Sequence, residues 1–536
     1  MTSLTATFGE IQRTGRSLSW AKRADRVVVV GAGIAGLSAA ITLATRGCAV
    51  RIIEKAAKPG GKLRQVEVNG RCIDGGPTVL TMRWVFQRLF DEAGLQFDDF
   101  VKTKPAEILC RHAWQDGSRL DLFAERRRSI EAIAAFSSPA EAKRYRRFAE
   151  TAERLYRALE PTFIDASKPN ALKLAFRMAG VDAKSLTLLN PMETLWQALC
   201  KHFTDPRLRQ LFARYATYSG ASPFEAAATL MLISHAEQAG VWTVQGGMIE
   251  LARGLERLAA SLGVEVRTNC EVQSLVTSAG RVSAVELPNG ERLSADAVVV
   301  NADAVALAEG LLGNHLMGSV SAVPRSRRSI SAITTAVVAR ARGFPLSRHN
   351  VFFSRNYRAE FDDIFKLSSL PREPTVYICA QDRPSRAPGN EPAHPAERAL
   401  VLINAPPNGD LHTYQKTEIE QCWERTQAVL RRCGLELDSE PLNRKTETPN
   451  TFHNLFPATG GALYGRSSHG WAAAFQRPGS RTLVPGLYLA GGSVHPGAGV
   501  PIAALSGRQA AVSLLDDLAS IRKSYRVAIF GGMSTR

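Results

Sequence analysis

Two short apolar runs near the start of the chain enclose a segment with helical periodicity. Residues 26–30 read RVVVV, a β-branched run bounded by glycine, which is typical of a buried parallel strand. Apolar residues then recur with roughly helical spacing over 34–43, and 48–53 is a second apolar run that ends at Glu54. The pattern predicts a strand, a turn, a helix and a second strand, in that order.

The stretch 27–43 is apolar enough that a membrane span is the alternative interpretation. Three glycines at the turn, followed by a helix, a strand and an acid, instead favour a dinucleotide-binding unit. Gly31 permits a tight turn, Gly33 lets the backbone approach a pyrophosphate, and Gly36 lets the helix pack close to the strand. The acid, Glu54, is expected to accept hydrogen bonds from ribose hydroxyls, which disfavours the 2′-phosphate of NADP.

The far end of the chain predicts the same combination of strand, glycine turn and helix. Residues 487–490 form the strand, Gly491-Gly492 the turn, and Val500-Pro501 the start of a helix that runs to about Ala519. A second helix N-terminus can face another negative part of the same cofactor, such as the flavin N1 and C2 carbonyl, which gain negative charge on reduction. A nicotinamide cofactor does not need this arrangement, so the far end of the chain favours FAD.

The composition adds a constraint on partners. Of the 536 residues, 45% are hydrophobic and 22% charged, which is ordinary for a folded protein of two or three domains. The formal net charge is +17, and three interpretations of it stay open: a solvated basic surface, an anionic membrane surface or nucleic acid. No zinc-finger spacing and no RNP signature is visible in the sequence, so we expect no nucleic-acid partner.

The cysteines and the first residues of the chain bear on metal binding and location. The sequence contains 8 cysteines but no CxxC pair, so we expect no metal site. Residues 1–24 are polar and basic and contain no secretory apolar segment. We therefore expect reduced thiols and a cytoplasmic location.

Blocks of sequence spread over the chain follow the order found in one known family. They are VVVVGAGIAGLSAA, EKAAKPGGK, IDGGPTVLT, GVWTVQGGM and LYLAGGSVHPGAGVPIAALSGRQAA. With these blocks the chain resembles the bacterial-type carotenoid desaturases, the phytoene desaturase family. GPTVLTMRWVFQRLF and HAWQDGSRLDLF are more similar to the members that desaturate hydroxyneurosporene or methoxyneurosporene at C3–C4. Phytoene desaturation is the alternative.

The resemblance implies an α/β fold and an FAD site. The expected fold is a Rossmann-like FAD-binding domain of the amine-oxidase-like flavoproteins, with a mixed-sheet substrate domain and a helical lid or membrane-docking region. Related amine oxidases carry an acid at the position of Gly492, so this chain lacks one expected ribityl contact. The residues that match the family's cofactor motifs are Gly31, Gly33, Gly36, Glu54, Gly60, Gly61, Arg64, Gly76, Pro77, Thr78, Val272, Gly491, Gly492, Val500 and Pro501.

The same reading divides the chain into seven segments, with the FAD-binding part split into three. The helical lid is rich in arginine, and we expect it to dock on an anionic membrane surface, so that the protein is peripherally associated with the inner or photosynthetic membrane. The segments are a flexible basic N-terminus (1–24), FAD-binding parts (25–104, 241–308 and 476–520), a helical lid and substrate region (105–240), a substrate domain (309–475) and a C-terminal tail (521–536).

The reaction implied by the resemblance is FAD-dependent dehydrogenation of an acyclic carotenoid. His495, in the flavin loop, is the first candidate for the proton acceptor, and Glu150, in the lid, is the second. A redox-neutral carotenoid isomerase and another amine-oxidase-like flavoprotein remain as alternatives. The final electron acceptor, such as oxygen or a quinone, is left open.

Overall fold

The first two predicted strands pair in parallel at the centre of a five-stranded sheet. β1 (Arg26–Val30) lies between β2 (Ala49–Ile53) and β13 (Ala297–Val300), and every pair in the sheet is parallel. β9 (Glu265–Arg267) joins β2 at one edge and β20 (Leu487–Leu489) joins β13 at the other. Segments hundreds of residues apart therefore form one sheet, as the sequence predicts for the FAD-binding part.

The alternating residues of β1 face two different cores. Val27 and Val29 pack against a helical layer, whereas Val28 and Val30 pack against a small antiparallel sheet on the other face. Burial of both faces explains why this strand reads as an unbroken run of valines. The helices of that layer are α1 (Ile34–Thr45), α2 (Trp84–Glu92), α10 (Ile249–Ser261) and α16 (Val500–Gly531), and the strands of the small sheet are β10 (Ser274–Ser278), β11 (Arg281–Glu286) and β12 (Arg292–Ser294).

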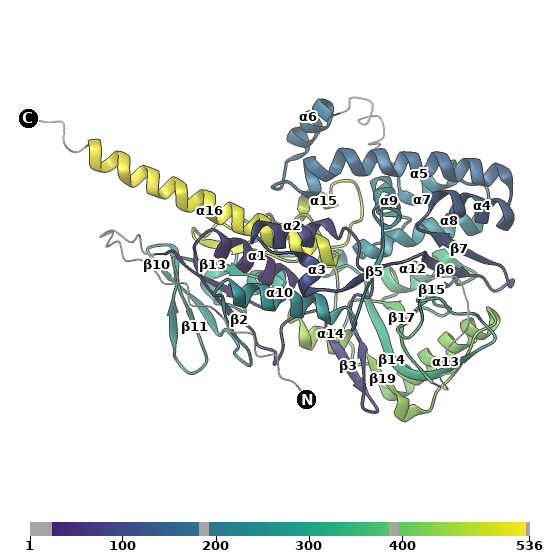
Figure 1. Ribbon diagram of the computed structural model, residues 1–536. Coiled ribbons are helices and arrows are strands. Elements are labelled where there is room, and N and C mark those ends of the chain that lie inside the picture. The colour runs from purple at the N-terminus through teal and green to yellow at the C-terminus, as the bar shows by residue number, and fades with distance from the viewer. Residues whose placement is uncertain (1–23, 182–191, 385–395, 532–536) are drawn as a thin grey trace, which may run out of the picture.

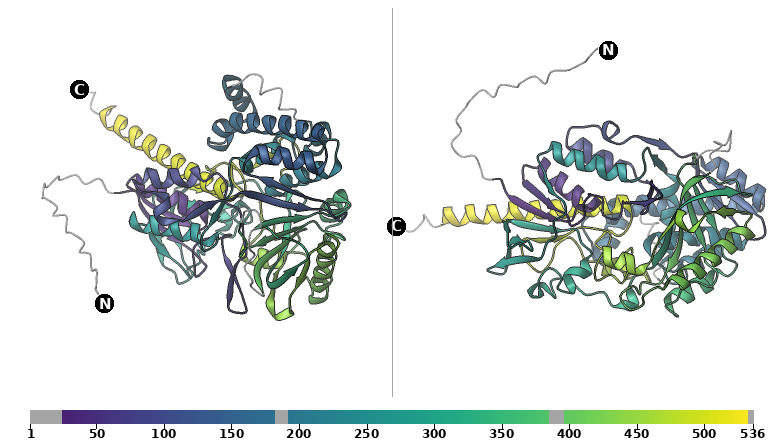
Figure 2. Two further views of the ribbon diagram at one scale, coloured as in Figure 1. Left: turned by 45° about the vertical axis from the view of Figure 1, so that its right-hand side comes forward. Right: turned by 90° about the horizontal axis from the view of Figure 1, so that it is seen from below.

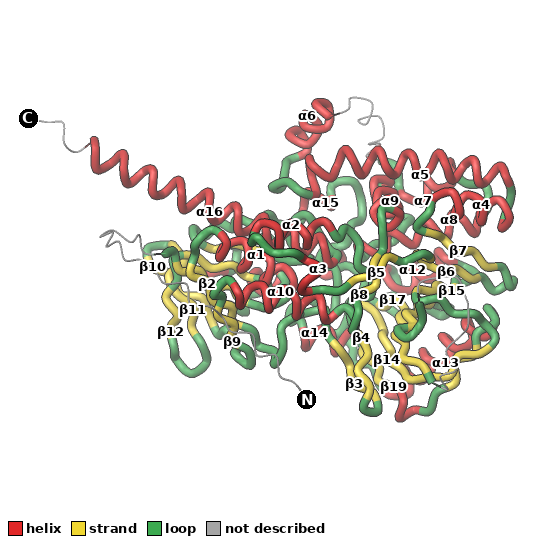
Figure 3. Tube along the Cα trace, in the orientation of Figure 1, coloured by secondary structure: helices red, strands yellow, loops and turns green. Residues whose placement is uncertain are grey.

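A larger mixed sheet lies beside this nucleotide-binding region, as Figures 1 and 3 show. Its order is β18-β14-β17-β16-β15-β6-β7, β19 also pairs with β14, and the only parallel pair in it is β15 with β6. The strands are β6 (Ile108–Ala113), β7 (Arg119–Phe123), β14 (Ser331–Arg342), β15 (His349–Phe352), β16 (Val376–Ala380), β17 (Glu397–Ala405), β18 (Glu436–Asp438) and β19 (Arg444–Glu447).

The segment 105–240, predicted as a helical lid and substrate region, begins in the substrate sheet. Residues 108–123 form β6 and β7 of that sheet. β6 is buried along its whole length, and its partner β15 lies far away in the sequence. No local sequence pattern predicts the pairing of β6 with β15. The helical part begins at Arg126.

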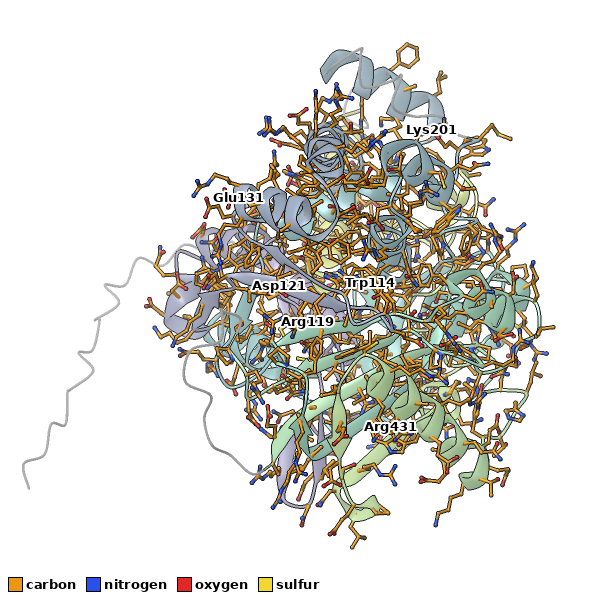
Figure 4. The ribbon with its side chains drawn as sticks, turned by 90° about the vertical axis from the view of Figure 1, so that its right-hand side faces the viewer. Trp114, Arg119, Asp121, Glu131, Lys201 and Arg431 are labelled. Carbon is orange, nitrogen blue, oxygen red and sulfur yellow. The ribbon has the colours of Figure 1, made fainter. Side chains whose placement is uncertain are left out.

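The lid helices cover one face of the substrate sheet, and α13 (Lys416–Arg432) covers the other. In Figure 4, Trp114 and Asp121 lie between the lid, which carries Glu131 and Lys201, and the helix that carries Arg431. The lid consists of α4 (Arg126–Phe136), α5 (Pro139–Leu159), α6 (Ala171–Val181), α7 (Leu195–His202), α8 (Pro206–Ala213) and α9 (Leu232–Gln238).

Smaller elements join the two regions. The hairpin of β3 (Gln65–Val68) and β4 (Arg71–Asp74) packs on the substrate sheet although it follows the first nucleotide-binding unit in the chain. β5 (Thr103–Pro105) pairs with β8 (Trp242–Val244) where the chain enters and leaves the lid region. The remaining helices are α3 (Phe97–Phe100), α11 (Ala304–Ala308), α12 (Tyr357–Phe365), α14 (Pro449–Leu455) and α15 (Ala473–Gln476).

The computed structural model describes residues 24–181, 192–384 and 396–531. The expected flexible N-terminus, 1–24, therefore lies outside the described residues except for its last residue. The expected tail from 521 is helical instead, because α16 continues to Gly531 and extends away from the rest of the molecule in both views of Figure 2. Among the described residues, no helix is both long and apolar enough to cross a membrane.

Candidate active site

One cavity of about 1060 Å³ runs between the nucleotide-binding region and the substrate sheet. Its walls contain fourteen of the fifteen residues predicted to bind the cofactor; the exception is Gly36, which lies beneath the first turn of α1. Val272 also lines the cavity, but from the loop before β10 rather than from within that strand. The predicted cofactor residues therefore come together.

The glycines of the first turn are required by close backbone contacts. Gly31 has φ +99°, a left-handed conformation that favours glycine. A Cβ atom on Gly36 would lie 2.0 Å from the Gly31 carbonyl oxygen, so only glycine lets α1 approach β1 this closely. α1 has Gly33 as its N-cap, and glycine has no side chain that could cap the helix. The N–H groups of Ile34 and Ala35, which both line the cavity, are therefore available to an anionic group, whereas the N–H of Gly36 is used within the protein.

Asn301 joins three segments around this turn. Its side-chain oxygen accepts a hydrogen bond from the Gly36 N–H at 2.9 Å, and its side-chain nitrogen donates one to the Ala490 carbonyl at 2.9 Å. A Cβ on Gly33 would lie 2.8 Å from the Asn301 side-chain oxygen, and one on Gly491 would lie 3.1 Å from its nitrogen. The carboxamide of Asn301 thus fixes the start of α1 to the end of β20.

Glu54 lies at the end of β2, as predicted, and its carboxylate is 7% exposed. One oxygen accepts a hydrogen bond from the Ala32 N–H at 2.6 Å, and the other accepts one from the Ala56 N–H at 2.8 Å. These two bonds orient the carboxylate and leave each oxygen with a further lone pair. The side chain is therefore held in place for the ribose hydroxyls that the sequence assigns to it.

The second glycine turn comes as close to its neighbours as the first. Gly60 donates its N–H to the Ala32 carbonyl at 2.9 Å, and a Cβ on Gly60 would lie 2.3 Å from the Leu63 carbonyl oxygen. A Cβ on Gly76 would lie 1.8 Å from the Lys62 carbonyl oxygen. Two glycine turns and the loop after β4 thus pack against one another without side chains, which leaves backbone exposed to the cavity.

The C-terminal loop brings a second helix N-terminus to the same cavity. Gly491, Gly492, Val500 and Pro501 all line it, and α16 begins at Val500. Beneath this loop, the buried guanidinium of Arg477 donates to the carbonyls of Gly492 and Tyr464, each at 2.9 Å. Burial lowers the pKa of Arg477 to about 10, which still leaves it charged at neutral pH. Arg477 therefore adds a positive charge next to the loop that the sequence assigns to the flavin.

These features fit FAD. The glycine cradle and the open N-terminus of α1 suit a pyrophosphate, and Glu54 suits a ribose. The N-terminus of α16 and the charge of Arg477 favour negative charge at the other end of the same cavity. A dinucleotide that ends in a flavin matches both ends, and its ring system would lie where the cavity meets the substrate sheet.

Arg64 lines the cavity, but its contacts differ from the predicted ones. Its guanidinium pairs with the carboxylate of Glu447, with one hydrogen bond of 2.7 Å, and lies 5.8 Å from the ring centre of Phe452. Instead of a free cation for a phosphate, Arg64 is a link between the glycine turn and the substrate sheet.

The structure does not support either predicted proton acceptor. His495 is 2% exposed and lies behind the cavity wall, where its ring contacts Phe163 and its Nε2 lies 3.0 Å from the Ala166 carbonyl oxygen. Burial lowers the pKa of His495 to about 4, so the ring is a weak base at neutral pH. Glu150 is exposed on α5 and does not line the cavity. We therefore assign His495 to packing and Glu150 to the solvated face of the lid.

Sequence reasoning missed several polar residues in and behind the cavity wall. Besides Asn301 and Arg477, these are Tyr377, whose hydroxyl lies 2.6 Å from that of the predicted residue Thr78, and His349, whose Nδ1 lies 2.8 Å from the Tyr377 hydroxyl. Asn301 had one usable signal, a polar residue directly after an apolar strand. The others lie on strands and loops of the substrate sheet whose partners are distant in the chain, and no local motif marks them.

Comparison with known proteins agrees with this site. Residues 34–515 match the family described as flavin containing amine oxidoreductase. The chain is 50% identical to the hydroxyneurosporene desaturase of Rubrivivax gelatinosus, over 96% of this chain and 98% of that one. It is 43% identical to the hydroxyneurosporene desaturase of Cereibacter sphaeroides, over 92% and 98% of the two chains. It is 31% identical to the 1-hydroxycarotenoid 3,4-desaturase of a Flavobacterium, over 90% and 97%.

Among solved structures, a triple mutant of putrescine oxidase has a TM-score of 0.58 to this chain. The two are 14% identical, and the match covers 92% of this chain and 99% of the other. At this identity the similarity concerns the fold, which is the predicted amine-oxidase-like α/β fold.

Removal of the Asn301 side chain should weaken FAD binding. Asn301→Ala leaves a buried N–H and a buried carbonyl without their partner, and each such loss costs about 1–3 kcal/mol. We expect the dissociation constant for FAD, measured by flavin fluorescence, to rise about tenfold or more. Asn289→Ala, which removes a side-chain acceptor in an exposed turn, should leave it unchanged. Equal affinities for FAD in Asn301→Ala and the parent would contradict this role.

The low pKa of His495 makes the folded state sensitive to acid. The imidazole is neutral in the folded protein down to a pKa of about 4, whereas the unfolded chain protonates it near its ordinary pKa of 6.5. Stability from this group is therefore present above pH 6.5 and is lost as the pH falls towards 4. In urea unfolding, the free energy of unfolding of His495→Gln should fall less between pH 6.5 and pH 4 than that of the parent. The difference between the two losses should be on the order of 3 kcal/mol at pH 4.

Parallel curves of unfolding free energy against pH for the parent and His495→Gln would contradict this account. The glutamine keeps an N–H donor for the Ala166 carbonyl, so flavin content and turnover should remain close to those of the parent. A loss of turnover with flavin retained would restore the original prediction that His495 accepts a proton.

Proposed function

Because the chain belongs to the flavin-containing amine oxidoreductases, and within them to the carotenoid desaturases, we propose that it uses FAD to desaturate an acyclic carotenoid. The proposed substrates carry a hydroxyl or methoxy group at C1, as hydroxyneurosporene and methoxyneurosporene do, and the new double bond forms between C3 and C4. The observation that carries the proposal is the 50% identity to a hydroxyneurosporene desaturase over 96% of the chain.

The proposed reaction removes two hydrogens from neighbouring sp³ carbons and lengthens the conjugated system by one double bond. FAD, when bound, supplies a two-electron oxidant that takes up one of these hydrogens as a hydride, and the other hydrogen leaves as a proton. The protein has to hold the polyene with the C3–C4 bond beside the flavin loop and to exclude water.

The walls of the cavity suit a long apolar substrate. Away from the glycine turns they consist largely of aliphatic and aromatic side chains from the lid, the substrate sheet and the segment after β19. These include Leu159, Phe163, Leu174, Leu230, Ile233, Val351, Leu400, Leu402, Phe452, Leu455, Trp471 and Phe475. An apolar wall of this extent is better suited to bind a hydrocarbon chain than a small polar amine.

The lid offers a surface for a membrane next to one end of the cavity. In α6, Leu172 is 68% and Phe176 70% exposed, while Leu174 of the same helix is buried and lines the cavity. α5 presents a row of exposed basic residues beside α6, formed by Lys143, Arg146, Arg147, Arg154 and Arg157. Figure 1 shows α5 and α6 together at one edge of the molecule. We propose that this edge rests on an anionic membrane, with α6 in the lipid and the basic row at the headgroups.

Pigment analysis tests the proposed substrate. The chain is expressed in cells that make neurosporene, with or without an enzyme that hydroxylates it at C1. We expect a red shift of the carotenoid absorption, from one added double bond, with the hydroxylated substrate. Conversion of phytoene, or no red shift with 1-hydroxyneurosporene, would overturn the proposal. A changed double-bond geometry without added conjugation would indicate an isomerase.

Co-sedimentation with vesicles tests the docking surface. Replacing Leu172 and Phe176 with serine removes two large apolar side chains that would each contribute about 1.5–3 kcal/mol on burial. Binding to vesicles of phosphatidylglycerol and phosphatidylcholine should fall at least about tenfold. Leu442→Ser removes a side chain that is 86% exposed in the short 3₁₀ helix Pro441–Asn443, which directly precedes β19, and should not change binding. β19 lies on the opposite side of the molecule from α5 and α6 (Figure 1). Equal binding by the parent and the double variant would contradict the docking surface.

A further inference from the structure

A buried charged cluster interrupts the apolar wall of the cavity. Arg214 is the first residue of a short 3₁₀ helix, Arg214–Ser219, and Glu237 lies in α9. The two side chains are 6% and 4% exposed, and both residues line the cavity. Charged side chains in such surroundings are costly unless they are paired and hydrogen-bonded. The presence of this pair beside a hydrocarbon site therefore calls for a function.

The hydrogen bonds of the cluster satisfy the carboxylate better than the guanidinium. Glu237 accepts hydrogen bonds from the hydroxyls of Tyr215 and Tyr218, the second at 3.2 Å. Arg214 donates one N–H to the Tyr218 hydroxyl, and a second nitrogen lies 3.6 Å from Glu237. That second nitrogen and Nε of Arg214 are buried and have no hydrogen-bond partner within the described part of the chain. The cluster thus offers unused donors next to a carboxylate.

The cluster lies close to the loop after β4, in which Gly76, Pro77 and Thr78 are predicted to bind the cofactor. Tyr377 is hydrogen-bonded to Thr78 of this loop. Burial raises the pKa of Tyr377, and nearby Tyr218 adds to this effect. Burial lowers the pKa of His349, the other partner of Tyr377, to about 3, and the charges of Arg348 and Arg214 add to this effect. Thr78, Tyr377, Tyr218, Arg214 and Glu237 all line the same cavity.

We propose that Arg214 and Glu237 bind the oxygen at C1 of the carotenoid, with the guanidinium donating a hydrogen bond to it. The inference rests on the proposed function and adds the group that recognises the substrate. A single carbon separates C1 from C3, so whatever binds this oxygen must lie close to the cofactor. The cluster shares the cavity with the predicted cofactor residue Thr78, and its unused N–H groups match an oxygen acceptor.

The same arrangement distinguishes three kinds of substrate. A C1 hydroxyl can accept from Arg214 and donate to Glu237, whose oxygens each keep a free lone pair. A methoxy group can only accept from Arg214. A substrate with no oxygen at C1 forms neither hydrogen bond and leaves the buried N–H groups of Arg214 unpaired. A polar site rejects a substrate analogue most strongly when its buried groups are left unpaired in this way. Arg214 and Glu237 are therefore specificity-determining residues rather than a structural ion pair.

The test compares specificity constants of the FAD-loaded enzyme for 1-hydroxyneurosporene, its methyl ether and neurosporene, all supplied in vesicles of the same phospholipids. Arg214→Met/Glu237→Gln removes both charges at nearly constant volume, so no unpaired charge is left behind. We expect kcat/KM for the hydroxylated substrate to fall at least tenfold and kcat/KM for neurosporene to stay the same or rise. Glu237→Gln alone should lower kcat/KM more for the hydroxylated substrate than for its methyl ether.

The matched control is Arg111→Met/Asp121→Asn, which removes a partly buried arginine–carboxylate pair, joined by two hydrogen bonds of 2.8 and 2.7 Å between β6 and β7. It should change kcat/KM for all three substrates equally. An equal loss for all three substrates in the Arg214→Met/Glu237→Gln variant, or no loss for any, would overturn the proposal. If the double variant does not bind FAD, the conservative Glu237→Gln comparison decides the question. Failure of the parent enzyme to desaturate any of the three substrates would instead contradict the proposed function.

Discussion

The two hydrogen bonds of the Asn301 carboxamide hold together the segments that enclose the cofactor end of the cavity. The start of α1, the end of β13 and the end of β20 come from three parts of the chain. Asn301 directly follows β13, and its side chain hydrogen-bonds to the start of α1 and to the end of β20. Glycine at 33, 36 and 491 keeps the contacts short, because a Cβ at each position would lie within 3.1 Å of the carboxamide or of the neighbouring backbone. The glycine motifs and Asn301 therefore depend on each other.

This arrangement places two helix N-termini at one cavity. α1 and α16 pack against each other, and a Cβ on Gly507 of α16 would lie 2.0 Å from the Ala35 carbonyl oxygen. Both helices begin at the cavity wall, where their positive ends favour the negative charge of a bound dinucleotide. Apolar side chains of the substrate sheet line the same cavity. In the proposed reaction, the few polar groups of that part of the wall are the ones that can hydrogen-bond to the substrate.

The sequence patterns predict the parts of this design that are local. The strand, glycine turn and helix at 26–45 and at 487–501 depend on neighbouring residues, and the structure has both. The role of Asn301 depends on the strand order β20-β13-β1, which no local pattern encodes. β6 pairs with a strand more than two hundred residues away, so no local pattern separates the strands from the helices within the segment 105–240. His495 lies in the correct loop, but its burial behind the cavity wall follows from contacts with the segment around Phe163. The Arg214 cluster is also non-local, since Glu237 reaches it from another helix.

The central claim is that one cavity holds FAD and a carotenoid so that the protein performs a two-electron desaturation. The most direct measurement mixes the FAD-loaded protein with 1-hydroxyneurosporene in vesicles without oxygen or any other electron acceptor, and follows flavin and carotenoid absorption together. The account predicts that the flavin absorption bleaches while the carotenoid absorption shifts to the red, with one molecule desaturated for each flavin reduced. A red shift without bleaching, or a change in the carotenoid with the flavin still oxidised, would contradict it.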